Sequence, residues 1–365
     1  MTRLGQQKEA LLPHQRPEPP ANARRTRVLL ISDGRPGHYR QSEGVVAALA
    51  RRGPVDVDRV ELATTLPIPK GLIPKLARLL PPAWLVRFVH GRDPAGFVRP
   101  DIIVSSGGST VGANVAFSRL LGVPNVFSGS TRGFPPAAFS LVLTPYLSAA
   151  TAPNIVAGPK PTPFDPDRVP PPRRLATGED LRGARVSLLV GGPTPYADFE
   201  AGDWARLASL VAGLVAEWGC RATVVTSPRT PDEAYAEILP VAEASGGAVS
   251  VIDYRTAGPG SIEAAFDCDL VLITSDSMSM MTEAAVSRRP AIALAPAKVG
   301  PNKDDEAVAG LAAARWLAVL PLAATGPATL ADSALALEPI AHNHLDRLAG
   351  LVTASIEGNP LPGLS

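Results

Sequence analysis

Cysteine is scarce in this sequence, which has only Cys220 and Cys268 among its 365 residues. The two form no CxxC motif, and no histidine stands near either of them. This pattern argues against a disulfide framework and against a cysteine–histidine zinc cluster. We therefore expect two buried thiols in a protein of the reducing cytoplasm.

Long apolar runs and an excess of one charge are lacking as well. No stretch of about eighteen apolar residues occurs, so no membrane-spanning helix is expected. The 35 Lys and Arg residues balance the 34 Asp and Glu residues to a formal net charge of +1. This balance gives no support to a nucleic-acid partner. The apolar fraction of 45% is that of a globular protein, and the length of 365 residues predicts two domains.

The order of segments along the chain predicts how these domains are built. Residues 1–25 are polar, contain prolines and lack an apolar signal core, so we expect a disordered leader. Short apolar runs then alternate with amphipathic stretches, which is typical of parallel sheets covered by helices. Prolines crowd residues 158–184 and block both helix and sheet, which indicates a linker. We predict α/β domains over residues 26–157 and 185–340, with a cleft between them, and a C-terminal helix and tail over residues 341–365.

The expected strands and helices can be given by residue range. The strands are expected at Val28–Ser32, Ile102–Ser105, Asn125–Phe127, Leu141–Thr144, Val186–Val190, Ala222–Thr226, Val249–Ile252, Leu270–Thr274 and Ala291–Leu294. The helices are expected at Gln41–Arg52, Gly112–Leu121, Phe199–Trp218, Asp232–Ala244, Ser261–Phe266 and Met278–Arg288. Parallel α/β sheets bind ligands beyond the carboxyl ends of their strands, so polar clusters that follow a strand are the candidate sites.

The first such cluster follows the first expected strand and contains Asp33, Gly34, Gly37 and His38. Glycines there let a ligand approach the backbone closely, and the start of a helix attracts anions. Asp33 and His38 are candidate catalytic residues, as a base or as the group that orients it. A tight strand-to-helix turn with a cap is the alternative. The spacing differs from GxGxxG, so the usual dinucleotide fingerprint is absent.

Three further clusters follow strands of the second predicted domain. Gly191 and Gly192 could present main-chain N–H groups to a diphosphate. Thr226 and Arg229 carry a hydroxyl and a guanidinium that suit phosphate. Tyr254 could pack on a nucleobase. Ordinary loop chemistry is the alternative for each of these clusters.

The segment from Ser275 to Glu283 places polar groups where a strand becomes a helix. Asp276 or Ser277 is suited to be the N-cap. The main-chain N–H groups of Ser277, Met278 and Ser279 would then hold a phosphate, and the methionine side chains would pack in the core. Glu283 would accept hydrogen bonds from ribose hydroxyls. A surface glutamate stabilised by the helix N-terminus is the alternative.

Acidic pairs do not indicate a metal site. The DxD formed by Asp267 and Asp269 precedes its strand and would lie at the wrong edge of the sheet. Residues 304–306 are interpreted as an acidic helix start, and no histidine pair has ligand spacing. We expect no metal and no cofactor.

Four motifs together resemble a known family. They are DGRPGHYRQ (33–41), GGPT (191–194), TSPRTP (226–231) and SDSMSMMTEA (275–284), in matching order over residues 27–340. The family is that of GT-B-like proteins that includes the plant mitochondrial fission factor of the "elongated mitochondria" type. The resemblance implies two facing Rossmann-like domains with parallel sheets, and a C-terminal helix that crosses back to the first domain. It also implies donor-site roles for Gly191, Gly192, Arg229, Ser277, Met278, Ser279 and Glu283, with Asp33, Gly37 and His38 across the cleft. The fission role belongs to the plant members and is not transferred.

These observations favour a metal-independent, glycosyltransferase-like enzyme that binds a nucleoside-diphosphate sugar between its domains. A non-catalytic scaffold that senses a nucleotide or docks to a membrane or protein is one alternative, and a sugar-nucleotide epimerase is another. Residues 69–91 are basic, apolar and broken by prolines, so they could rest on an anionic membrane. Packing of this segment in the core is the competing interpretation. The expected location is the cytoplasm, with peripheral membrane contact as an option.

Overall fold

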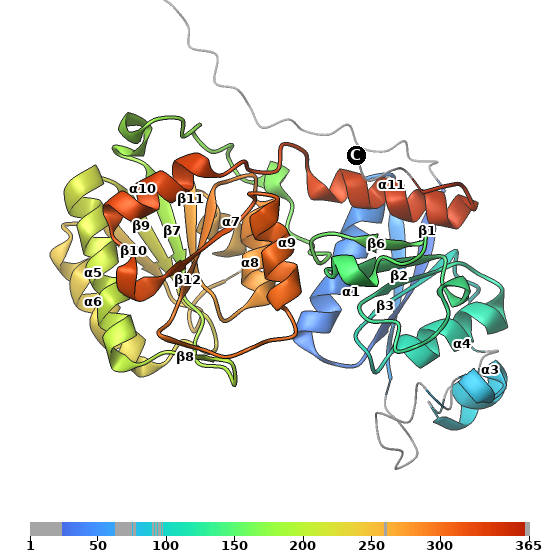
Figure 1. Cartoon of the computed structure of the whole chain (residues 1–365). Coiled ribbons are helices and arrows are strands. Elements are labelled where there is room, and N and C mark those ends of the chain that lie inside the picture. Colours follow the sequence, from blue (N-terminus) through green and yellow to red (C-terminus); the bar gives the residue numbers. More distant parts are fainter. Residues whose placement is uncertain are drawn as a thin grey trace, which may run out of the picture.

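The computed structural model describes residues 24–62, 75, 78–89, 91, 93, 96, 98–258 and 261–361. It contains two lobes, each built on a six-stranded sheet of parallel strands with helices against it (Figure 1). The strand orders are β2-β1-β3-β4-β5-β6 in the first domain and β10-β9-β7-β11-β12-β14 in the second. The predicted α/β class with two parallel sheets is confirmed. The predicted leader lies almost entirely outside the described residues.

The strands of the first domain run through its buried centre, except for the edge strand β2. They are β1 (Thr26–Ser32), β2 (Val55–Glu61), β3 (Ile102–Ser106), β4 (Asn125–Ser128), β5 (Leu141–Thr144) and β6 (Ile155–Ala157). The helices are α1 (Pro36–Ala50), α3 (Pro82–Trp84), a π-helical turn at Leu85–Val89 and α4 (Val111–Leu121). Strands β2 and β6 were not predicted. In β2, charged residues alternate with valines because one face of an edge strand stays in solvent.

Helix α1 begins five residues earlier than the sequence predicted. Pro36 occupies its first turn, where a missing N–H costs nothing and the fixed φ suits a helix. Consequently His38 and Arg40 lie on the helix itself, at the carboxyl edge of the first sheet. The predicted turn is therefore only three residues long, from Asp33 to Arg35.

The second domain repeats the alternation of strands and helices. Its strands are β7 (Arg185–Leu189), β8 (Ala197–Asp198), β9 (Arg221–Val225), β10 (Val249–Ile252), β11 (Leu270–Thr274), β12 (Ala291–Ala295), β13 (Lys298–Val299) and β14 (Ala318–Pro321). Its helices are α5 (Ala201–Trp218), α6 (Asp232–Ala244), α7 (Ser261–Ala265), α8 (Met278–Val286), α9 (Asp305–Ala313) and α10 (Pro327–Ala336). The five strands predicted for this domain all form, with ends shifted by at most one residue.

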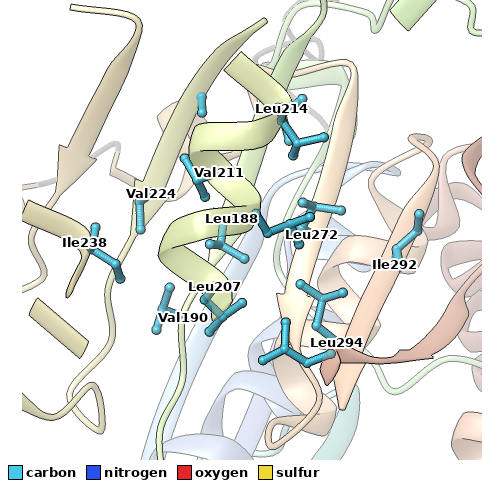
Figure 2. Packing of buried hydrophobic residues seen from close by; sticks show 14 of the residues in the cluster. Leu188, Val190, Leu207, Val211, Leu214, Val224, Ile238, Leu272, Ile292 and Leu294 are labelled. Atoms are coloured by element: carbon cyan, nitrogen blue, oxygen red, sulfur yellow. The ribbon is translucent and has the colours of Figure 1, made fainter. Parts of the chain in front are cut away.

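Packing of α5 against the sheet illustrates what stabilises this domain. Leu207, Val211 and Leu214 recur at helical spacing and point toward Leu188 and Leu272 of the central strands (Figure 2). All five side chains are buried, and each contributes roughly 1.5–3 kcal/mol of hydrophobic free energy. The helix ends at Gly219, whose φ of 59° is the left-handed conformation that favours glycine.

The last helix, α11 (His344–Glu357), crosses back from the second domain and packs on α1 of the first (Figure 1). Its buried Leu345, Leu348 and Val352 join the apolar cluster that contains Val45 and Leu49 of α1. The C-terminal helix implied by the family resemblance is thus present.

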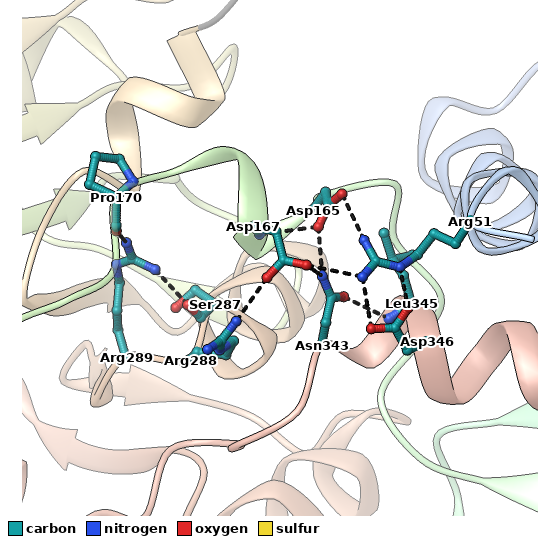
Figure 3. A network of polar contacts seen from close by, with 10 residues as sticks. All are labelled: Arg51, Asp165, Asp167, Pro170, Ser287, Arg288, Arg289, Asn343, Leu345 and Asp346. Atoms are coloured by element: carbon teal, nitrogen blue, oxygen red, sulfur yellow. Dashed lines mark hydrogen bonds and ion pairs between the residues drawn. The ribbon is translucent and has the colours of Figure 1, made fainter. Parts of the chain in front are cut away.

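The proline-rich linker is held in place by two arginines (Figure 3). Arg51, whose side chain is 5% exposed, bonds Asp165 and Asp167 of the linker and Asp346 of α11. Arg289 is almost fully buried and donates to three carbonyl oxygens, those of Pro170, Cys268 and Ser287. These contacts fix the linker against both domains and so fix the position of one domain relative to the other.

Candidate functional site

The first group of predicted site residues gathers where β1 ends and α1 begins. His38 Nδ1 lies 3.0 Å from Asp33 Oδ2, and the Ser109 hydroxyl donates to the same carboxylate. Gly34 has a φ of 74° and makes the turn between them. Burial raises the pKa of Asp33, but the hydrogen bonds from Ser109 and His38 outweigh it and hold that pKa below its usual value. Asp33 is therefore a carboxylate at neutral pH.

The geometry of this pair assigns a tautomer to His38. A carboxylate can only accept, so the ring nitrogen Nδ1 carries the proton and donates it to Asp33. In the neutral ring the other nitrogen, Nε2, has a free lone pair, and no side chain in the described ranges bonds to it. Gly107 is required beside the ring, because a Cβ at that position would lie 2.1 Å from Nδ1. The arrangement can take up a proton at Nε2.

The second group gathers at the carboxyl ends of β7, β9 and β11. The amide of Gly191 donates to Thr274 Oγ1 at 2.7 Å, and that of Gly192 donates to Asp276 Oδ2 at 3.2 Å. The Arg229 guanidinium pairs with the same carboxylate oxygen. Both glycines are necessary, since a Cβ at Gly191 would meet the Asp276 carboxylate and one at Gly192 would lie 1.8 Å from the Arg229 carbonyl oxygen. Three separate motifs thus form one surface.

Asp276 was one of two residues predicted as the N-cap of α8, but it has a different role. Its side chain is completely buried under the glycine loop, and Oδ1 has no hydrogen-bond partner among the described residues. Ser277 caps α8 instead, with its hydroxyl accepting from the Met280 amide at 3.4 Å. Met278 is buried in the core, as its type suggests, which leaves its backbone for a ligand.

The two domains meet at a narrow crevice between α1 and α8. We use "interdomain crevice" for the space lined by Gly37, Arg40, Gln41, Lys160, Pro161, Thr162, Ser279, Thr282 and Glu283. Figure 1 shows α8 and α9 on one side of the junction of the two lobes and α1 on the other, and the bond from Arg40 to Glu283 joins α1 to α8. Gly37 and Ser279, predicted on opposite sides of a cleft, therefore line the same space.

Glu283 is engaged from both neighbouring elements. Its Oε1 accepts hydrogen bonds from the Arg40 guanidinium of α1, with Nε at 3.1 Å, and from the Thr162 hydroxyl of the linker at 3.0 Å. No described residue donates to Oε2. Glu283 therefore has one oxygen fixed by protein groups and one available to a hydroxyl of a ligand.

A third interdomain contact closes one end of this region. Lys160 Nζ and Tyr146 Oη both donate to Asp304 Oδ1, at 3.0 and 2.9 Å. Burial lowers the pKa of Lys160 despite the pairing with Asp304, and burial together with Asp304 raises the pKa of Tyr146. A cation thus lies along the same crevice as the first turn of α8.

Three predicted residues lie outside this assembly. Thr226 is buried and connects the ends of β9 and β10, where its hydroxyl accepts from Tyr235 and from the Tyr254 amide. Tyr254 is 38% exposed in the turn after β10. Ser275 is used by its backbone, which donates to the Leu294 carbonyl. No hydrogen bond within the described segments links these three to α1.

Sequence reasoning assigned no individual role to four residues that the structure brings to the site. They are Arg40, Ser109, Lys160 and Thr162. Arg40 stands inside the DGRPGHYRQ motif and shares a helix face with Gly37, so an earlier start for α1 would have revealed it. Lys160 and Thr162 belong to a proline-rich segment that carries no periodic signal.

The structure places the rejected DxD where the sequence predicted. Asp269 is buried and pairs with Arg185, which explains its burial without a metal. Among the described residues, no group of three or more His, Cys, Asp or Glu side chains could hold a metal ion. Within the same ranges, every helix is too short or too polar to cross a bilayer.

Part of residues 69–91, for which membrane contact and core packing were the competing interpretations, lies outside the described residues. Within this segment, Leu79 is 82% exposed and Trp84 is 40% exposed. Arg78 is exposed, but its guanidinium stacks on the buried Phe134 and donates to the Arg132 carbonyl. Core packing and surface exposure therefore coexist in this segment.

Comparisons with known proteins agree with this architecture. A solved structure of a putative UDP-N-acetylglucosamine 2-epimerase from Listeria monocytogenes aligns over 94% of this chain and all of its own, with a TM-score of 0.54 and 11% identity. The UDP-GlcNAc 2-epimerase from Methanocaldococcus jannaschii aligns over 90% of this chain and 99% of its own, with 12% identity and a TM-score of 0.49. MurG from Acinetobacter baumannii aligns over 92% of this chain and 96% of its own, with 13% identity and a TM-score of 0.48. Only the first of these scores supports the assignment of a GT-B-like fold. No curated protein matches the sequence.

A family model extends the comparison to the sequence itself. The model for "Mitochondrial fission ELM1" matches residues 36–348, a range that includes the helices α1 and α8 and the linker between the domains. Since the match covers most of the chain, this protein belongs to the mitochondrial fission ELM1 family and has a GT-B-like fold.

Proposed function

We propose that this protein is a metal-independent glycosyltransferase that binds a nucleoside-diphosphate sugar on the face of its second domain that borders the interdomain crevice. The observation that carries the proposal is the Asp33–His38 pair, which presents an imidazole with a free Nε2 beside a crevice shared with the other domain. A base oriented by a carboxylate is a common device for activating a hydroxyl. Nucleotide-sugar enzymes among the similar folds are consistent with this substrate class.

The donor would lie on the second domain. Its diphosphate would meet the first amides of α8, those of Met278 and Ser279, which lie at the positive end of the helix dipole. The amides of Gly191 and Gly192 are bonded to Thr274 and Asp276, so this loop would position the donor surface, and Lys160 supplies positive charge along the crevice. Glu283 Oε2 would accept from a ribose hydroxyl. The amides of α8 and Lys160 would stabilise the negative charge that develops on the leaving diphosphate.

The acceptor would lie on the first domain. His38 Nε2 takes the proton from an acceptor hydroxyl while that oxygen forms a bond to the anomeric carbon of the sugar. The bond from this carbon to the diphosphate oxygen breaks, and the nucleoside diphosphate leaves. Asp33 stabilises the imidazolium that forms, because its carboxylate bonds Nδ1 throughout. The products are the glycoside, the nucleoside diphosphate and one proton.

The test separates binding from turnover. Calorimetric titration with UDP, GDP, CDP and TDP sugars should find one that binds, and His38→Ala should bind it with unchanged affinity but release nucleoside diphosphate far more slowly. Loss of the oriented base should lower the rate by about 10²–10⁴. His342→Gln, an exposed histidine beyond the site, is the matched control. The proposal fails if no nucleotide sugar binds, or if His38→Ala turns over at the wild-type rate.

A sugar-nucleotide epimerase is the second candidate, since one similar structure is described as such an enzyme. Product analysis distinguishes the two: an epimerase returns the donor with one inverted centre and needs no acceptor. Binding without either product would favour the non-catalytic scaffold. In that case the Arg40–Glu283 ion pair across the crevice is the contact that a bound ligand would change.

A further inference from the structure

A second cavity lies on another face of α1, away from the Asp33–His38 pair. We call it the hinge cavity; it has a volume of about 410 Å³. It lies between α1, the strands β1 and β2, the linker and α7. Arg40, Glu43 and Ala47 line it from one stripe of α1, whereas His38 projects from a different face. A cavity of this size falls in the range of small-molecule sites.

The walls of the hinge cavity divide into an apolar floor and a charged mouth. Leu30, Val57 and Phe164 form part of the floor, and Leu30 and Phe164 are buried. Three guanidinium groups, those of Arg40, Arg59 and Arg168, outnumber the two carboxylates of Glu43 and Glu263 in the lining. This combination suits a molecule with an apolar body and an acidic head, because the body covers the floor while the head meets the arginines.

The three arginines differ in how far protein groups neutralise them. Arg40 pairs with Glu283, and Arg59 lies 3.7 Å from Glu43. Arg168 has no ion-pair or hydrogen-bond partner for its side chain among the described residues, and it is exposed beside the cavity. A guanidinium at the mouth of a cavity without a protein acceptor is available to an anion from solution.

We propose that the hinge cavity binds a small amphiphilic anion, with a phosphate or carboxylate held by Arg168 and Arg59 and an apolar body against Val57. The proposal does not require donor binding, although Arg40 lines both the hinge cavity and the interdomain crevice. Glu263 of α7 contributes to the wall from the second domain. A ligand there contacts both domains and the linker, so its binding energy stabilises their observed arrangement.

Hexyl phosphate is a suitable probe, because it combines a short apolar body with a phosphate. Calorimetric titration of the full chain should give saturable binding at submillimolar to millimolar concentration. Inorganic phosphate and hexyl glucoside, which each lack one half of the probe, should bind about tenfold more weakly or not at all. Hexanoate distinguishes the head groups: tighter binding than hexyl phosphate assigns a carboxylate, and weaker binding assigns a phosphate.

Two variants locate the binding. Arg168→Met should weaken hexyl phosphate binding by about tenfold, the contribution of one charged hydrogen bond. The melting temperature should stay unchanged, because the Arg168 side chain has no ion-pair or hydrogen-bond partner among the described residues. Val57→Phe should fill the space above the apolar floor and so prevent hexyl phosphate from binding. Arg347→Met on the exposed side of α11 is the matched control and should bind as wild type. The inference is wrong if hexyl phosphate does not bind, or if Arg168→Met binds it with wild-type affinity.

Discussion

His344 gives this protein a measurable sensitivity to mild acid. Its ring lies at the start of α11, with Nε2 3.2 Å from the Thr162 carbonyl and Nδ1 buried without a partner among the described residues. Burial lowers the pKa of His344 to about 4, against an ordinary value of 6.5, although the Thr162 carbonyl, Asp165 and Asp346 oppose the shift. Arg51, which lies in the same network, acts in the direction of burial.

The sign of the effect follows from which state takes up the proton. Below the ordinary pKa of 6.5, the unfolded chain protonates His344 and the folded chain does not, so the free energy of unfolding falls as the pH falls. The loss begins near that ordinary pKa and is complete near the folded pKa of about 4. One pH unit below the ordinary value, at about pH 5.5, it amounts to about 1.4 kcal/mol. The limiting loss at lower pH is about 3 kcal/mol.

Urea unfolding followed by circular dichroism at about pH 7.5 and about pH 5.5 measures this difference. His344→Gln keeps a donor for the Thr162 carbonyl but cannot be protonated, so it should show a pH-dependent loss smaller by about 1.4 kcal/mol. His342→Gln, two residues earlier and exposed, should keep the full loss. An equal loss in His344→Gln and the wild type would refute the reasoning, since the proton would then be taken up elsewhere.

Three other changes test the linker, the donor surface and the exposed segment. Arg289→Met should destabilise the fold by about 3 kcal/mol in urea unfolding, because three carbonyl oxygens, two of them in buried bonds, lose their donor. Arg288→Met removes a partly exposed ion pair and should cost less than about 1 kcal/mol. Similar losses in the two variants would contradict the role of the buried network. Gly192→Ala should abolish nucleotide-sugar binding in calorimetry, since its Cβ would collide with the Arg229 carbonyl. Gly310→Ala on α9, where a Cβ meets no atom, is the control and should bind normally. Normal binding by both variants would show that the Gly192 loop does not contribute to the donor site. Leu79→Glu should reduce sedimentation with anionic liposomes if residues 69–91 contact a membrane, and unchanged sedimentation would end that hypothesis.

The sequence by itself determined the α/β class and most of the second domain. Central parallel strands such as β11 are buried on both faces, so they are short apolar runs bounded by polar turns and can be recognised without tertiary information. Edge strand β2 was missed for the opposite reason, because one of its faces is in solvent and its charges break the apolar run. The candidate loops could be selected because parallel α/β sheets bind ligands beyond the carboxyl ends of their strands, and the loops that follow a strand can be identified from the order of the sequence alone.

Only the tertiary structure decided which of these loops act together. Asp33 and Ser109 are 76 residues apart in sequence, and Arg40 and Glu283 are 243 apart, so no local pattern predicts either contact. The path of the linker and the crossing of α11 bring α1 opposite α8 and create both the interdomain crevice and the hinge cavity. Local chemistry selects the residue types of a site, whereas the distances between them depend on how two separately folded sheets are packed against each other.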